Sequence, residues 1–268
     1  MNLQIIKPSP ALRPYVKYYW ALDNCVHPQK AHAHRIVPTG LPEMTFYFQD
    51  IPSYARKSGE TKSVSVMNGQ QDQFYEVVIS GRLSMFSIIF QAWAFKPVFG
   101  LPAGEIFNLN LPLIDLLKKG PDEISAKLAA AENLEKRKRV VEEFLLKRLS
   151  QKKEYELKRI CSSIALINQS RGSARIESLA DCACLSRKQY ERTFSDFVGI
   201  SPKKFLKIVR FQHVLHQSGL HPAKSLTELS YDCGYYDQAH MINDFKQLSG
   251  MTPRQYLKEC TPESDYFS

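Results

Sequence analysis

The chain has 268 residues, of which 44% are hydrophobic and 24% charged, a composition typical of a globular protein with room for two domains. No apolar run approaches the roughly eighteen residues of a membrane span, and the N-terminus does not resemble a secretion signal, so we expect a cytoplasmic protein without a membrane part. The net charge of +9 comes from both halves, with 19 basic and 14 acidic residues in 1–151 (+5) and 17 and 11 in 152–260 (+6). This balance is compatible with a nucleic-acid partner in either half.

The first 90 residues contain apolar runs separated by Gly, Pro, Ser or Asp, which is the pattern of β-strands. A short turn and a strand are expected within 8–23, and further strands at 34–37, 44–48, 64–67, 74–80 and 83–90. Gly81-Arg82 predicts a tight hairpin between the last two. The pattern predicts a β-rich domain, either a small barrel or a sandwich.

Residues 93–107 are punctuated by Pro and Gly and predict a loop, and helical spacing follows at 113–117, 124–131 and 134–149. The apolar stripe of the last helix packs either on its own domain or on a second copy, which would give a homodimer. Its basic run, 136–139, is either a nucleic-acid patch or the solvated face of the helix. The solvated face is the favoured interpretation.

Two groups of side chains in the first half suggest a ligand. One group is aromatic and forms either core or the lining of a small-molecule effector site: Tyr15, Tyr18, Trp20, Phe46 and Phe48. The other group could hold a metal, as in a β-barrel enzyme: His27, His32, His34 and Glu43. The first half lacks nucleophile and phosphate-loop motifs, and no cysteine pair has C-x-x-C spacing, so we predict no catalytic residue, metal or cofactor.

The second half begins with an amphipathic helix at 154–168 and a short helix at 176–183. After a tight turn at Cys184-Leu185, Ser186 is a good cap for a helix at 187–197. At 100° per residue, one side of this helix carries Tyr190, Phe194 and Phe197, and the other carries Lys188, Arg192 and Ser195, with Glu191 at the flank. A short helix, a tight turn and a second helix with a polar outer face predict a helix-turn-helix motif.

The chain repeats this motif. Residues 229–237 repeat 179–186 at an offset of 50, and from Gly199 and Gly250 onward the offset is 51, so the second copy has one added residue in its turn. Ser225 and Glu228 form a capping box, Gly234 supplies the turn, and Asp237 caps the next helix. That helix points Met241, Phe245 and Leu248 inward and Ala239, Asn243 and Lys246 outward.

A helix at 202–217 connects the copies. It begins with Ser201-Pro202, a cap followed by proline, and Thr252-Pro253 repeats the device. The sixteen expected residues span about 24 Å. With the offsets of the two outer helices added, such a connector can hold them near one DNA turn apart, about 34 Å, so that they enter consecutive major grooves.

These features closely resemble the AraC/XylS family of transcription regulators over residues 155–258. The matching residues are Leu179-Ala180, Ser186 with Phe194, Gly199-Ile200-Ser201-Pro202, Arg210-Phe211, Gly234-Tyr235, and Phe245-Lys246 with Gly250-Met251-Thr252-Pro253. Through residues 12–16 and 19–20, the first half more weakly resembles a β-rich N-terminal domain of that family.

The resemblance implies an α+β protein with two domains. Residues 1–150 would be a β-rich barrel-like or sandwich-like domain ending in helices, which often binds a small effector or mediates dimerisation in this family. Residues 153–260 would be an all-α, seven-helix, double helix-turn-helix domain that binds double-stranded DNA near promoters. RNA polymerase would be a further partner if the protein is an activator.

The resemblance also implies which residues meet DNA. The family's base-reading positions fall on Lys188, Glu191, Arg192, Gln238, Ala239, Ile242 and Asn243, and Ser195 and Lys246 share the outward faces. The family commonly has arginine where Asn243 stands, and serine or threonine where Ile242 stands. We therefore expect the first motif to carry more of the specificity.

Three functions remain open from the sequence. The leading hypothesis is a DNA-binding regulator whose first domain senses a small molecule. In the second, the first domain serves only protein association. The third is a metal-dependent β-barrel enzyme fused to a DNA-binding module.

Overall fold

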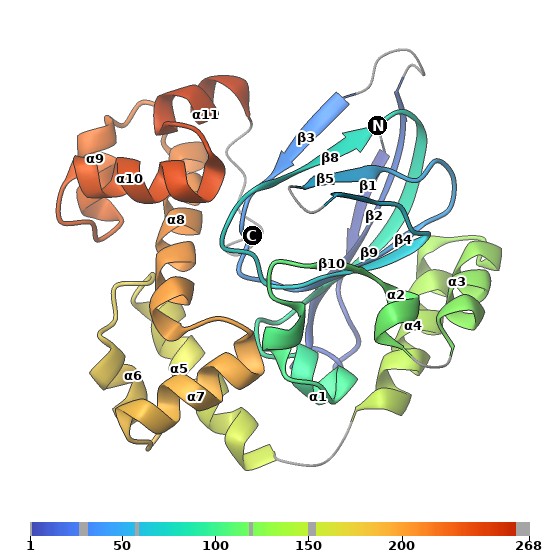
Figure 1. Ribbon diagram of the computed structural model, residues 1–268, viewed down its shortest axis with the longest axis horizontal. Coiled ribbons are helices and arrows are strands. Elements are labelled where there is room, and N and C mark those ends of the chain that lie inside the picture. Colours follow the sequence, from blue (N-terminus) through green and yellow to red (C-terminus); the bar gives the residue numbers. More distant parts are fainter. Residues whose placement is uncertain (1, 27–31, 57–58, 118–119, 150–153, 261–268) are drawn as a thin grey trace. The chain divides into compact units, whose positions relative to one another are not determined.

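The computed structural model describes residues 2–26, 32–56, 59–117, 120–149 and 154–260 and contains two compact units (Figure 1). The first unit is built from the first half of the chain, and the main division lies between residues 152 and 153. The second unit contains the C-terminal helices together with two short segments of the first half, Val37–Gly40 and Gln70–Phe74.

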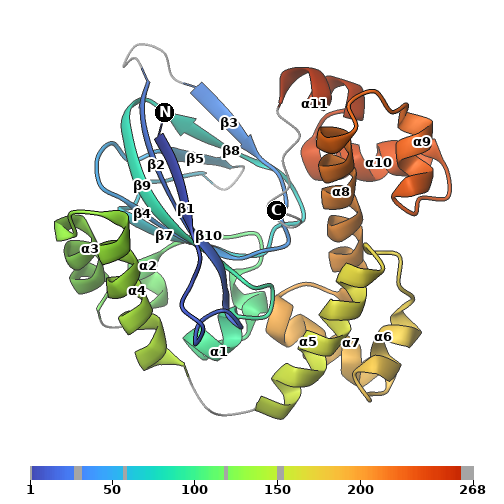
Figure 2. The same cartoon turned by 180° about the vertical axis from the view of Figure 1, so that it is seen from behind.

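Two antiparallel sheets form the centre of the first unit. The larger has the order β1 (Asn2–Ile6), β2 (Val16–Val26), β9 (Gly81–Phe90), β4 (Glu43–Tyr47), β7 (Ser65–Asn68), β10 (Asn110–Pro112), with β1 at one edge (Figure 2). The smaller has the order β3 (His32–Ile36), β8 (Tyr75–Ile79), β5 (Ser53–Arg56), β6 (Gly59–Thr61). The β-rich prediction is confirmed. The strands that the sequence pattern missed, β1, β5, β6 and β10, are short.

The predicted hairpin at Gly81-Arg82 is wrong. Strand β8 pairs with β3 and β5, whereas β9 pairs with β2 and β4, so the chain changes sheets at this point. Gly81 has φ +78°. This backbone conformation favours glycine, because glycine lacks a Cβ. Arg82 N–H donates to Asp50 Oδ2 at 2.6 Å, an acceptor outside both strands. The local sequence signals a sharp turn but cannot tell which strands will pair on either side of it.

Helices follow the sheets in the first unit: α1 (Phe95–Phe99), the 3₁₀ helix η1 (Ala103–Ile106), α2 (Leu113–Leu116), α3 (Pro121–Ala130) and α4 (Leu134–Arg148). Helix α1 and η1 correct the loop predicted for 93–107. Helix α1 buries Phe95, Val98 and Phe99 within five residues before Gly100 ends it with φ +76°. Burial of these side chains outweighs the proline and glycine that argued against a helix.

Two hydrophobic cores hold the first unit together. The helix-side core lies between the larger sheet and the helices and contains Tyr19, Met44, Phe46, Phe86, Ile124, Leu128, Val141 and Leu145. The inter-sheet core contains Tyr47, Tyr54, Val66, Tyr75, Val77, Leu83 and Met85. Along β4, successive residues face the two cores in turn, with Met44 and Phe46 in the helix-side core and Tyr47 in the inter-sheet core, because side chains alternate along a strand.

Helix α4 packs on its own domain. Val141 and Leu145 are buried in the helix-side core, and Val140 and Phe144 pack against it. Its apolar stripe therefore no longer argues for a homodimer. The basic run is divided between two surroundings. Lys136 and Arg139 are exposed, and Lys136 pairs with Glu132, as expected for a solvated face, whereas Arg137 is half-buried with its guanidinium 4.0 Å from the Phe48 ring at the edge of the helix-side core.

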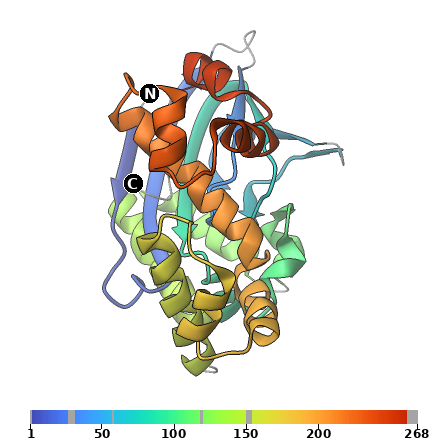
Figure 3. The same cartoon turned by 90° about the vertical axis from the view of Figure 1, so that its left-hand side faces the viewer.

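Seven helices are described in the second unit, as expected: α5 (Glu154–Gln169), α6 (Ile176–Cys182), α7 (Arg187–Val198), α8 (Pro202–Leu220), α9 (Leu226–Asp232), α10 (Gln238–Ser249) and α11 (Pro253–Glu259). Helix α8, orange in Figure 3, runs from the helices of the first motif to those of the second. Its 19 residues span about 28 Å, somewhat more than the sequence suggested.

The two motifs repeat the same aromatic packing. Phe194 lies against Phe205 with ring centroids 5.5 Å apart, and at an offset of 51 Phe245 lies against Tyr256 at 5.4 Å. Helix α8 adds Phe211, whose ring is 4.9 Å from that of Phe245. Edge-to-face contacts of this kind contribute about 1 kcal/mol each beyond the burial of area. Helix α8 thus belongs to the cores of both motifs.

The turn after α5 approaches α8 very closely. Gly172 has φ +81°, and its N–H donates to the carbonyl of Ile167 at 2.9 Å. A Cβ at this position would lie 2.7 Å from the carbonyl oxygen of Leu206 and 2.9 Å from the backbone nitrogen of Arg210. Both atoms belong to the backbone of α8, which cannot rotate away. Glycine is therefore required twice, for its conformation and for its size.

We predict that Gly172→Ala destabilises the second unit by about 3 kcal/mol, from about 1 kcal/mol of left-handed strain and the rest from backbone displacement. Gly234→Ala is the matched control, because Gly234 also has a positive φ (+73°) but its Cβ would meet only Ser173 Cβ at 3.3 Å. It should cost about 1 kcal/mol. Urea unfolding of both variants measures the difference, and equal losses would contradict the steric argument.

Candidate nucleic-acid interface

The turns of the two motifs share one backbone hydrogen bond and one left-handed residue. Leu185 N–H donates to the carbonyl of Ala180 at 3.0 Å, and Tyr235 N–H donates to that of Ser230 at 2.9 Å, an offset of 50. The residue before each has a left-handed backbone, with φ +50° at Cys184 and +73° at Gly234. Both motifs therefore leave their first helix through the same left-handed turn.

The caps of the second helices repeat at an offset of 51. Ser186 caps α7, as predicted, by accepting a hydrogen bond from the backbone N–H of Gln189, and the Gln189 side chain completes a capping box that was not predicted. Asp237 accepts from His240 N–H at 2.7 Å. The offset changes between Tyr235 and Asp237, so the added residue in the second turn is Tyr236.

The outer face of α7 is basic. Lys188 and Arg192 are exposed, while Glu191 and Ser195 are half-buried at its margin. Tyr190, Phe194 and Phe197 are buried on the opposite side, which confirms the predicted inward face. The face that a DNA groove could meet therefore has two positive charges near the start of the helix.

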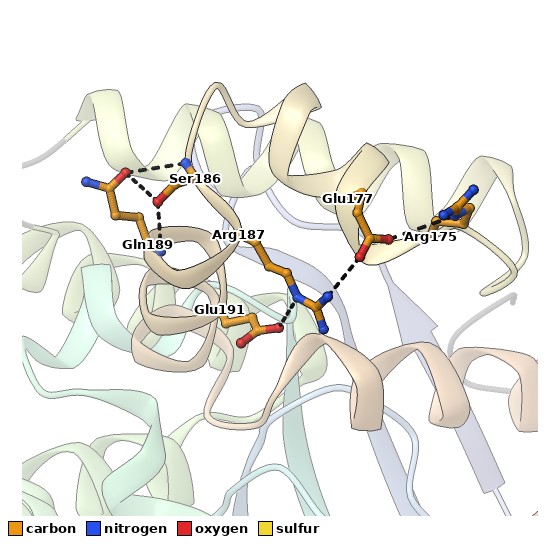
Figure 4. A network of polar contacts seen from close by, with 6 residues as sticks. All are labelled: Arg175, Glu177, Ser186, Arg187, Gln189 and Glu191. Carbon is orange, nitrogen blue, oxygen red and sulfur yellow. Dashed lines mark hydrogen bonds and ion pairs between the residues drawn. The ribbon is translucent and has the colours of Figure 1, made fainter.

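Glu191 belongs to a chain of ion pairs at the margin of this face (Figure 4). The Arg187 guanidinium contacts Glu191 Oε1 through Nε at 3.1 Å and Glu177 Oε1 through Nη1 at 2.9 Å. Arg175 extends the chain with a 3.9 Å contact to Glu177. The four side chains are between 45% and 83% exposed, so each pair is weak and can exchange. The Glu191 carboxylate is therefore partly occupied by Arg187.

The outer face of α10 is nearly neutral. Ala239, Asn243 and Lys246 are exposed, and Gln238 and Ile242 are half-buried. Gln238 Oε1 accepts a hydrogen bond from the Thr227 hydroxyl of α9 at 2.9 Å. The helix buries Met241, Phe245 and Leu248, as predicted from its periodicity.

A buried carboxylate fixes α10 against α8. Asp244 is 7% exposed, and its Oδ1 lies 2.7 Å from Lys207 Nζ on α8. Arg210 of α8 and His240 of α10 lie 3.8 and 3.7 Å from Oδ2. Because the carboxylate is held from α8 and from its own helix, it fixes how α10 is rotated about its axis.

The sequence contains a signal for Asp244, although this residue was not among the predicted ones. Asp244 stands three residues after Met241 and four before Leu248, so it lies on the apolar stripe of α10. A carboxylate on such a stripe needs a cation, because an unpaired buried charge is very costly. Tyr235 packs nearby, with the Arg210 guanidinium 5.2 Å from its ring centre. Burial, with the nearby Asp244 charge, raises the pKa of Tyr235 far above its ordinary value.

The five aromatic residues proposed for an effector do not share one face. Phe46 is buried in the helix-side core, and Tyr15 and Phe48 pack against that core. Trp20 packs instead against the inter-sheet core, and Tyr18 is half-buried. The set predicted from sequence is therefore split between the two sides of the larger sheet.

A polar group that the sequence did not reveal lies beside Trp20. The indole Nε1 donates to Glu43 Oε1 at 3.2 Å, and the hydroxyl groups of Tyr47 and Tyr54 are 2.6 Å apart. Burial raises the pKa of both tyrosines well above the ordinary value, so both keep their protons. Strand alternation was the available signal, since Glu43 and Tyr47 lie on the same face of β4.

The histidine cluster is only partly described. His34 is exposed on β3 and His32 lies in the same strand, while His27 lies outside the described residues. Within the described part of the chain, no group of three His, Cys, Asp or Glu side chains could hold a metal ion. Nor does any helix in that part have the length and apolar character needed to cross a membrane.

Two family models match the chain. Residues 179–259 match a family described as "Helix-turn-helix domain", and residues 4–112 match a "Domain of unknown function (DUF6597)". An uncharacterized HTH-type transcriptional regulator of Haemophilus influenzae is 35% identical over 101 residues, 37% of this chain and 33% of that protein. The HTH-type transcriptional activator RhaS of Escherichia fergusonii is 28% identical over 82 residues, 30% and 28% of the two chains. The chain thus spans about a third of the length of these curated relatives.

Solved structures resemble the chain at low scores. ToxT from Vibrio cholerae aligns with 97% of this chain and 100% of its own at 9% identity and a TM-score of 0.49. The DNA-binding domain of AdpA, solved with a target DNA, aligns over 36% of this chain and 87% of its own at 21% identity and a TM-score of 0.34.

We predict that Asp244→Ala destabilises the second unit by about 3 kcal/mol, because it leaves Lys207 and Arg210 without their buried acceptor. Asp232→Ala is the matched control, since Asp232 pairs with Lys224 at 2.7 Å on the exposed surface of α9. The loss of stability in Asp232→Ala should be much smaller. Chemical denaturation followed by circular dichroism measures both, and a similar effect of the two substitutions would refute the role given to Asp244.

Proposed function

We propose that this protein is a sequence-specific, DNA-binding transcription regulator of the AraC/XylS type in the cytoplasm. The match of residues 179–259 to a helix-turn-helix family and the similarity to HTH-type transcriptional regulators support this proposal. Helices α7 and α10 would enter consecutive major grooves on one side of the duplex. The observation that carries the proposal is the repeated motif, which places an exposed second helix at each end of the rigid connector α8.

The length of α8 supports binding by both motifs at once. Nineteen residues span about 28 Å, and one turn of DNA is about 34 Å long. The aromatic contacts of Phe205 and Phe211 hold each motif to this connector. A single chain would therefore contact two grooves without a second copy.

The first motif would supply most of the base reading. Lys188 and Arg192 are exposed, and Arg pairs with the O6 and N7 atoms of guanine through two hydrogen bonds. Glu191 would accept from a cytosine amino group if DNA phosphates draw Arg187 away from it. Ser195 lies further along the same face and would contact the backbone.

The second motif would contribute fewer directional contacts. Asn243 can pair with an adenine edge, and Gln238 can do so after leaving Thr227. Ala239 and Ile242 offer only apolar contact, for example to a thymine methyl group. Lys246 would bind phosphate.

We expect Arg192→Ala to weaken binding to the specific site by about 2 kcal/mol, roughly thirtyfold, and Asn243→Ala to weaken it less. Arg175→Ala is the control for loss of charge, because Arg175 is exposed at the N-cap of α6, outside the outer face of α7. Sites selected from genomic DNA provide the probe for mobility shifts at fixed salt. A larger loss from Asn243→Ala would reverse the assigned order of the motifs.

We propose that the first domain senses a small molecule at the polar group formed by Tyr47 and Tyr54 of the inter-sheet core and by Trp20 and Glu43 next to them. An indole, a carboxylate and two protonated tyrosines can together orient a polar ligand through hydrogen bonds and ring contacts. The ligand would then change how the reading helices engage DNA. If the output is activation, RNA polymerase would be a further partner.

The alternative is a first domain that serves only association. Strand β1 favours it, because this edge strand has no charged residue and exposes Leu3 and Ile5, at 49% and 61%. Uncharged, apolar edge strands readily pair with another strand. A homodimer through paired β1 strands would follow.

One comparison separates these alternatives. If the domain serves association, the Leu3→Lys/Ile5→Lys double variant should elute later than the wild type in gel filtration of the full chain, because charge at an edge prevents pairing. If the domain senses a ligand, a metabolite library should contain a compound that raises the unfolding temperature of the wild type but not of Glu43→Gln. An unchanged elution volume together with no stabilising compound would reject both.

A further inference from the structure

We propose that Tyr236, the residue added to the second motif, is a neutral contact to the DNA backbone, with its hydroxyl donating to a phosphate and its ring against the adjacent sugar. This inference rests on the proposed function. The outward face of α10 has only one lysine for binding the DNA backbone. The inference gives Tyr236 a main part in docking the second motif on DNA.

The position of the added residue follows from hydrogen bonds. Tyr235 is equivalent to Leu185 because their N–H groups donate to equivalent carbonyls, and Asp237 is equivalent to Ser186 because both cap the next helix. Only Tyr236 has no counterpart in the first motif. The link from the C-cap of the first helix to the N-cap of the second is Ala183–Ser186 in one motif and Cys233–Asp237 in the other.

The two neighbouring tyrosines have opposite surroundings. Tyr235 is 4% exposed and packs against Arg210 and His240. Tyr236 is 87% exposed, more than any other exposed large hydrophobic side chain in the part of the chain that the structure describes. The core is therefore completed by Tyr235, and the ring of Tyr236 contributes little to packing.

Its place in the motif points to DNA. Tyr236 directly precedes the cap of α10, and in helix-turn-helix proteins the N-terminal part of the second helix is the part that contacts DNA. A tyrosine hydroxyl is a donor that phosphates commonly accept from. A ring with only two side-chain torsions also loses little entropy when it is fixed.

The charge distribution explains why such a contact is needed here. At the offset of 51, Arg187, Lys188 and Arg192 of the first motif are replaced by Gln238, Ala239 and Asn243. The second motif also begins its helix with the carboxylate of Asp237, which repels phosphate. Without cations at these positions, an uncharged donor can bind the backbone without displacing counterions.

The test compares Tyr236→Ala and Tyr236→Phe with Lys246→Ala, in fluorescence anisotropy titrations with the full chain. The probes are the selected operator and a random duplex of the same length, each at several salt concentrations. We expect Tyr236→Ala to weaken binding about tenfold on both duplexes, since a backbone contact carries no sequence information. Tyr236→Phe should lose only part of this, because the ring remains.

Salt dependence distinguishes the two kinds of contact. Both Tyr236 variants should keep the wild-type slope of log K against log salt, whereas Lys246→Ala should make it shallower by about one. Thermal unfolding should be unchanged in Tyr236→Ala, because the side chain is exposed, so a loss of binding cannot be ascribed to unfolding.

Three results would overturn the inference while leaving the proposed function intact: unchanged affinity of Tyr236→Ala, a loss confined to the operator, or unchanged affinity with reduced transcription in a reporter assay. The second would make Tyr236 a base reader, and the third would assign it to a protein partner. If the wild type binds neither duplex and selects no genomic site, the proposed function itself fails, and this inference with it.

Discussion

The placement of helix α10 depends on one ion pair, between the buried Asp244 of α10 and Lys207 of α8. Aromatic packing alone leaves a helix some freedom to turn about its axis, because ring contacts are not strongly directional. An ion pair at 2.7 Å limits that freedom, with Arg210 and His240 completing the surroundings of the carboxylate. The first motif has Thr193 at the equivalent position and is held by its aromatic core. Helices α7 and α10 are thus held against the same connecting helix by different physical interactions.

Duplication has preserved the scaffold and changed the surface. Caps, left-handed turns and core rings recur at fixed offsets because each is needed to build a short helix pair. The outer faces carry no such requirement. The first face is cationic and partly bound by its own carboxylates, and the second is almost neutral. If both faces bind DNA, as proposed, the first contact would be strong and salt-dependent, and the second would be weak and tolerant of salt.

Features that depend on residues close together in the sequence could be predicted, and features that depend on distant residues could not. The helices of the second unit, the cap at Ser186 and the inward residues of α7 and α10 follow from local periodicity and were predicted correctly. The change of sheets at Gly81 was not, since it depends on strands distant in the sequence. The split of the effector aromatics has the same origin, because Phe46 and Trp20 face opposite sides of one sheet. The role of Asp244 was not predicted, although the sequence shows that this residue lies on the apolar stripe of α10.

The left-handed turn of the first motif also says something about the history of the two copies. Cys184 holds φ +50° although a side chain there costs about 1–2 kcal/mol, while Gly234 occupies the same position without that cost. Cysteine and glycine codons differ by a single base, so the relaxed form is one mutation away. Proteins need only enough stability to remain folded, so selection does not have to remove a strain of this size from the turn.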